Sequence, residues 1–113
     1  MDFNRFPDKK AVEAQKDYLK SADLTLLDLS FVDLRGANLV YADLSNSNLS
    51  NANFTGANLN GANLSNVIAV GANFSKCEFD VLSNFDYANL NGANFTGANL
   101  TDAKGLINLG LAT

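Results

Sequence analysis

Hydrophobic positions recur every five residues over most of this chain. From Ala22 to Asp102 most units have a small residue, usually Ala, followed by Asn or Asp, then Leu or Phe, then two polar or small residues. We number these positions 1 to 5, so Ala52, Asn53 and Phe54 are positions 1, 2 and 3 of one unit. Side chains alternate along extended backbone, so positions 1 and 3 face one way and position 2 the other. Sixteen units predict a chain wound around a narrow apolar core.

The pattern resembles the A(D/N)LXX consensus of the pentapeptide repeat family, including its short cyanobacterial members. The resemblance implies an all-β fold, a right-handed quadrilateral β-helix with four units per coil and about four coils in this chain. One feature of the sequence favours four units per coil. Phe54, Phe74 and Phe95 are separated by 20 and 21 residues, so they are expected to stack on one side above Leu34.

The phase of the repeat changes once. Position 3 keeps one phase up to Phe79 and is shifted by one residue from Phe85 onward. We therefore expect one extra residue, Val81 or Leu82, in a bulge at a corner, because an insertion within a side would turn the inward residues outward.

Residues 1–21 precede the repeat and are expected to cap it. After a short extended lead, Asp8 is a candidate N-cap of an α-helix near residues 8–20. We expect Tyr18 and Leu19 to cover the first coil, and the large position 1 residues Leu27 and Val32 to contact this helix. The helix carries charges of both signs and few large apolar residues, which disfavours a membrane-surface role.

The composition argues against an enzyme. Histidine is absent, and the single cysteine, Cys77, occupies a position 1 site where a small buried residue is expected. The carboxylates Glu78, Asp80 and Asp86 are predicted to face outward from a convex surface, which does not exclude water. We therefore predict no catalytic residues, no cofactor and no metal. The net charge of −4 disfavours nucleic acid binding.

The sequence favours a non-enzymatic structural or protein–protein interaction module. The alternative is an acidic DNA mimic that acts on a topoisomerase, DNA gyrase, as some members of the family do. A mimic needs closely spaced carboxylates. The acidic residues of the lower coils are expected on three different sides: Asp23, Asp28, Asp33 and Asp43.

Outward apolar residues are the candidate contacts with an unknown protein partner. They form two predicted groups, one of Phe31, Ile68 and Val70 and the other of Val40, Tyr41 and Val81. The tail, residues 103–113, either caps the last coil or pairs with another molecule. We expect a monomer or a weak end-to-end dimer, with contacts through Leu106, Ile107, Leu109 and Leu111.

The chain shows neither an apolar run long enough to span a membrane nor the apolar core of a secretion signal near its start. We therefore expect no membrane interaction and a cytoplasmic location, and a processed mature form stays open. The predicted division is a capping extension at 1–21, a solenoid at 22–102 and a cap or tail at 103–113.

Overall fold

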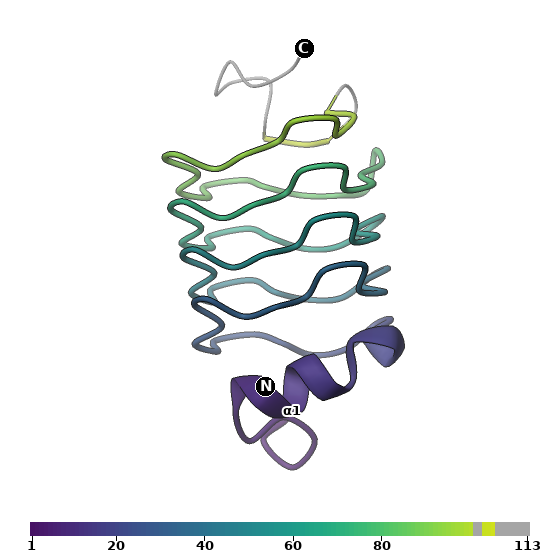
Figure 1. Cartoon of the computed structure of the whole chain (residues 1–113), viewed down its shortest axis with the longest axis vertical. Coiled ribbons are helices and arrows are strands. Elements are labelled where there is room, and N and C mark those ends of the chain that lie inside the picture. Colours follow the sequence, from purple (N-terminus) through teal and green to yellow (C-terminus); the bar gives the residue numbers. More distant parts are fainter. Residues whose placement is uncertain (101–102, 106–113) are drawn as a thin grey trace.

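The computed structural model describes residues 1–100 and 103–105, which wind into a four-sided solenoid above a short N-terminal helix (Figure 1). Position 2 residues of successive coils form parallel β-bridges, as between Asp23 and Asp43. The partners lie 20 residues apart in the lower coils, so four units complete one turn. The coils begin at Ala22, Ala42, Ala62 and Ser83. Sides 1 to 4 of the first coil are centred on Asp23, Asp28, Asp33 and Asn38.

The apolar core is the stack of inward residues at positions 1 and 3. Most of these side chains are fully buried. The rings of Phe54 and Phe74 stack with centroids 5.1 Å apart and planes 5° apart, and Phe95 stacks on Phe74 at 5.1 Å. Phe85 meets Phe74 edge to face. The predicted stack of three rings on one side is therefore confirmed.

The requirement for Asn or Asp at position 2 has a local cause. The side-chain Oδ1 of Asn53 accepts a hydrogen bond from the backbone N–H of Thr55 at 3.0 Å, and Asp23 does the same for Thr25 at 3.1 Å. The bond recurs along all four sides of the solenoid. Each such side chain faces outward and accepts a hydrogen bond from a turn N–H that has no partner in the β-bridges.

Three position 1 residues are polar, and each bonds to the coil below. Ser47 Oγ donates to the Leu24 carbonyl at 2.6 Å, Cys77 Sγ to that of Phe54 at 2.9 Å, and Ser83 Oγ to that of Leu59 at 2.8 Å. The small polar residues that replace Ala therefore keep their polar atoms satisfied inside the core.

The extra residue lies at the corner between the third and fourth coils, as the phase change predicts. The bridge partners are 20 residues apart at Asn58 and Glu78 but 21 apart at Asn63 and Asn84. The backbone turns at Val81 and Leu82. The bulge leaves the inward residues on both sides of it facing the core.

The predicted helix near residues 8–20 is wrong in extent. Helix α1 spans Lys9–Ala14, begins with Asp8 as its N-cap and is followed by the 3₁₀ helix η1, Lys16–Tyr18. The carbonyl of Lys16 accepts a hydrogen bond from the Asn38 N–H at 2.9 Å, so it is not available to a longer helix.

The burial of the N-terminal residues differs in part from the expectation. Leu19 is fully buried, whereas Tyr18 is 74% exposed, so its predicted covering role is wrong. The lead is not extended, because the Phe6 N–H donates to the Asp2 carbonyl at 2.9 Å. Phe6 is buried with Val12 in the same core as the solenoid.

The bridge ladder continues to Lys104, which pairs with Asn84. Residues 101–102 and 106–113 lie outside the described part, and so do the predicted end contacts Leu106, Ile107, Leu109 and Leu111. The domain boundaries therefore stay predictions.

Candidate functional site

The corners of the solenoid carry large exposed side chains on an unfavourable backbone. Position 5 adopts positive φ in nearly every described unit, a conformation that suits Gly and, less well, Asn. Four large apolar or aromatic residues nevertheless adopt it with φ near +60°, and all are exposed: Leu26, Phe31, Tyr41 and Tyr87.

The repeat itself shows that the turn does not need these large side chains. Directly above Phe31 on the same corner the chain has Asn51 and Gly71. Above Leu26 it has Asn46 and Asn66, again with positive φ. An L-residue other than Gly costs roughly 1–2 kcal/mol in this conformation. Phe31 and Leu26 are exposed and lie outside the hydrophobic core, so packing of the core does not explain these large side chains.

The first predicted group is exposed but not contiguous. Phe31 is 73% exposed at the corner after side 2 of the first coil. Ile68 and Val70 lie on side 2 and its corner two coils higher and are 51% and 39% exposed. The structure therefore brings Ile68 and Val70 together and separates Phe31 from them by the coil that carries Asn51.

The second predicted group follows the corner after side 4. The ring of Tyr41 lies against Gly61 of the coil above, where an added Cβ would clash with Cδ1 of the ring. Val81 is exposed, whereas Val40 is only partly exposed. The ring of Tyr41 therefore packs against the backbone of the coil above.

Sequence reasoning missed several exposed apolar residues and one groove. Leu26, Leu82 and Tyr87 are exposed, and the first and last of these are identifiable from the sequence as large residues at position 5. Phe3 is 62% exposed and lies in the lead, where no repeat predicts its position.

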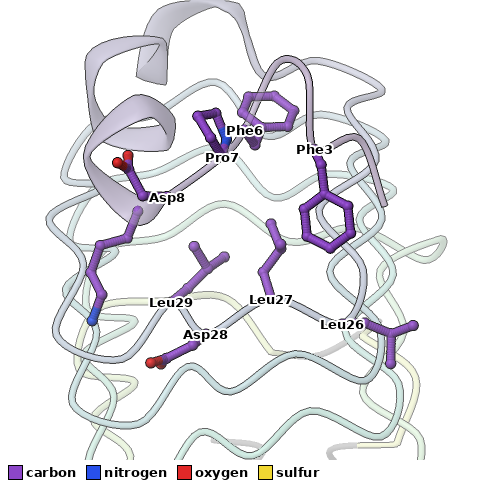
Figure 2. Close-up of a pocket in the computed structure, with 9 residues that line it drawn as sticks. Phe3, Phe6, Pro7, Asp8, Leu26, Leu27, Asp28 and Leu29 are labelled. Carbon is purple, nitrogen blue, oxygen red and sulfur yellow. The ribbon is translucent and has the colours of Figure 1, made fainter.

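The groove lies where the lead passes the N-terminal edge of the first coil. Figure 2 shows the ring of Phe3 beside Leu27, with Phe6 and Pro7 opposite Leu29. The groove has a volume of about 350 Å³ and mostly apolar walls. Its polar lining residues are Asp8, Lys9 and Asp28. It is large enough for one or two apolar side chains.

A second hollow, of about 380 Å³, is polar and follows side 4. Asn38, Asn58 and Glu78 form its wall, and Lys20 lies at one end. The Oδ1 atoms of both asparagines already accept hydrogen bonds from the backbone, Asn38 from Val40 N–H and Asn58 from Asn60 N–H. These side-chain oxygens therefore hold the turns of side 4.

The acidic residues of the lower coils lie on three sides, as expected. Asp23 and Asp43 share side 1, and Asp28 and Asp33 lie on sides 2 and 3. Asp23 pairs with the Met1 ammonium at 2.8 Å, and Asp33 with Arg35 at 2.8 Å. These partners reduce the local negative potential.

Hydrogen bonds lower the pKa values of three of these carboxyls. The Met1 ammonium, with help from Thr25, lowers the pKa of Asp23 to about 2. The Arg35 side chain and N–H lower the pKa of Asp33 to about 2, and the Ser30 hydroxyl and N–H lower that of Asp28. All three carboxyls are therefore ionised at neutral pH.

Cys77 is not a reactive thiol in this fold. Its side chain is buried in the core, and burial raises its pKa to about 12. The described residues contain no group of three His, Cys, Asp or Glu side chains placed to hold a metal ion. Among the same residues, no helix is long and apolar enough to cross a membrane.

Comparison with protein families gives one match. The family described as pentapeptide repeats matches in eight copies, over residues 18–51, 28–66, 47–80 and 82–104. These segments cover most of the chain. A search of the curated proteins gave no match.

Three solved structures similar to this chain are described as pentapeptide repeat proteins. A pentapeptide repeat protein from the thylakoid lumen of Arabidopsis thaliana is 34% identical over 71% of this chain, with a TM-score of 0.48. HetL from the cyanobacterium Nostoc, involved in heterocyst differentiation regulation, is 38% identical over 76% of the chain, with a TM-score of 0.36. A Cyanothece protein is 31% identical over 67%, with a TM-score of 0.36. This chain spans 66%, 44% and 51% of their lengths.

Proposed function

The chain belongs to the pentapeptide repeat family, whose fold is a right-handed quadrilateral β-helix, and on this premise we propose that it is a non-enzymatic protein–protein interaction module. The observation that carries the proposal is the exposure of Phe31 and Leu26 at corners where the same chain elsewhere uses Asn or Gly. Exposed large side chains that cost folding energy are typical of recognition surfaces.

The contacts proposed for the partner are the outward apolar residues. They are Phe31, Val40, Tyr41, Ile68, Val70 and Val81, together with Leu26 on the next corner. These residues lie at or next to the corners after sides 1, 2 and 4, and the corner after side 2 carries both Phe31 and, two coils higher, Val70. That repetition up one corner favours a partner that lies along the solenoid rather than one that inserts a single side chain. The unknown partner and the cytoplasmic location stay predictions.

We also propose that residues 1–21 cap the solenoid. The Glu13 carboxylate accepts a hydrogen bond from the Asp33 N–H at 2.7 Å, and the Lys16 carbonyl accepts one from Asn38. Both acceptors take the place of the carbonyls that a preceding coil would supply. A terminal repeat needs such a cover to stay soluble.

The interaction hypothesis is tested by purifying the tagged chain from its host. A variant with Phe31, Ile68 and Val70 changed to Ser is compared with a control in which Arg35, Thr55 and Lys76, on side 3 and its corner, are changed to Ser. We expect specific partners with the wild type and the control, and their loss with the apolar variant. Equal recovery from all three would contradict the proposed surface.

A gyrase supercoiling assay distinguishes the DNA-mimic alternative from the interaction module. We expect no inhibition, because Asp23 and Asp33 are paired and the carboxylates do not form a continuous row. Inhibition that disappears when Asp23, Asp28, Asp33 and Asp43 are replaced by Asn would favour the mimic.

A further inference from the structure

The N-terminal edge of the first coil is open at Asp28 on side 2, and the Lys9 ammonium donates to the Ser30 carbonyl at the end of that side at 2.6 Å. On sides 3 and 4 the edge N–H groups of Asp33 and Asn38 donate to Glu13 and Lys16. Within residues 1–100 and 103–105, neither the backbone N–H nor the carbonyl of Asp28 has a hydrogen-bond partner. Side 2 therefore presents an unpaired rung, the kind of edge to which another extended segment can add.

In the next coil up, the backbone groups of the equivalent residue, Asn48, are both paired. The Asn48 N–H donates to the Leu27 carbonyl at 2.9 Å, and its carbonyl accepts from the Leu29 N–H at 2.8 Å. Asp28 is the same position one coil lower, so its two groups would pair in the same way with a further unit. All the bridges are parallel, and an added unit would continue that direction.

The apolar groove lies at the same place. Its walls include Phe3 and Phe6 from the lead and Leu27 and Leu29 from side 2, on either side of Asp28 (Figure 2). A unit added below Asp28 would place its position 1 and position 3 side chains against this lining. The site therefore fits an extended segment with an apolar–polar–apolar sequence.

The chain contains such a segment outside its sixteen units. Ile107, Asn108 and Leu109 repeat the order of position 1, 2 and 3 residues. Continuing the 20-residue register from Lys104 would place Leu109 opposite Asn89 and turn Asn108 inward. The segment is therefore out of phase with the top of its own solenoid.

The segment cannot reach the groove of its own chain. Lys104 stands four bridges above Asp23, which is about 19 Å at the usual spacing of paired strands. Asn108 is four residues beyond Lys104, and four residues span at most about 14 Å. Only a second molecule can supply this segment to the groove.

We propose that the groove is a docking site for a second copy of this chain, whose residues 106–111 add one rung below Asp28. The proposal rests on the proposed role as an interaction module and names one partner. The contact is head to tail, so it leaves a free groove and a free tail at the two ends of each dimer, and longer chains form at higher concentration.

Sedimentation of the full chain from about 1 µM to about 500 µM tests the association. Leu109→Asp is compared with Asn108→Asp, which adds the same charge at the outward position. Asp28→Pro, which removes the open N–H, is compared with Asp28→Asn, which keeps it. Thermal melts check that each variant is folded, and amide exchange of Asp28 reports on the rung itself.

The proposal predicts concentration-dependent assembly and slower exchange of the Asp28 amide as the concentration rises. Leu109→Asp and Asp28→Pro should each weaken assembly about tenfold or more, while both controls assemble as the wild type does. A chain that stays monomeric, or assembly that Asp28→Pro leaves intact, would overturn the proposal. Neither result affects the partner test with Phe31, Ile68 and Val70, so the two proposals can fail separately.

Discussion

The carboxylate of Asp80 accepts a hydrogen bond from the backbone N–H of Gly61 at 2.9 Å, at the corner where the coil above carries its extra residue. At regular corners a backbone carbonyl accepts this bond, as Thr55 does for Gly36. Asp80 also accepts from the Leu82 N–H at 3.0 Å. The Asp80 side chain therefore replaces the backbone acceptor that the insertion removes from the hydrogen-bond ladder at this corner.

Replacing Asp80 by Ala should destabilise the fold. The change leaves the N–H of Gly61, which is only partly exposed, without its acceptor, and a lost bond of this kind costs about 1–3 kcal/mol. Asp80→Asn keeps an Oδ1 acceptor and serves as the control. Urea unfolding of both variants measures the difference. A loss for Asn as large as that for Ala would show that charge, and not the acceptor, matters at this corner.

Leu59→Asp and Asn58→Asp test which residues face inward. Leu59 is fully buried, so a carboxylate there has no partner, and we expect a loss of about 4 kcal/mol or more, or failure to fold. Asn58 faces outward and uses Oδ1 to accept the Asn60 N–H at 3.0 Å, a bond that Asp retains. Thermal melts should rank Leu59→Asp far below Asn58→Asp. The reverse order would contradict the alternation of the repeat.

The stability of the first coil should depend on acid pH. The pKa values of Asp23, Asp28 and Asp33 are lowered in the fold, to about 2 for Asp23 and Asp33, while an unfolded Asp titrates at about 3.9. A lowered pKa stabilises the fold above the unfolded value, so the free energy of unfolding should fall as the pH drops from about 4 to about 2.

The matched variant for this pH dependence replaces all three residues by Asn. It keeps the side-chain acceptors of the turns and removes the titrating carboxyls. Urea unfolding between pH 5 and pH 2 should then show a shallower fall for the variant than for the wild type. Equal slopes would mean that other groups cause the acid sensitivity.

Much of this fold can be predicted from the sequence because each unit repeats the same pattern of inward and outward residues. The spacing of Phe54, Phe74 and Phe95 predicts their stack, and the phase change predicts the bulge before Phe85. The lead has no such repetition. The burial of Phe6 depends on a turn at Asp2 and on contacts with the first coil, which no pattern shows.

The candidate surface was predictable in part. The outward direction of Phe31 and Ile68 follows from their positions in the unit. The groove does not, because Phe3 reaches it from the non-repeating lead. The pairing of Lys16 with Asn38, which helps end the helix early, likewise depends on contacts between distant segments.

The central claim is that the exposed apolar corners serve recognition and not folding, and the urea unfolding of Phe31→Asn tests it most directly. Because Asn tolerates positive φ better than Phe and little buried surface is lost, the free energy of unfolding should rise by about 0.5–1 kcal/mol. The reciprocal control, Asn46→Phe, should lower it by a similar amount. A loss of 1 kcal/mol or more in Phe31→Asn would show that Phe31 stabilises the solenoid and would contradict the claim.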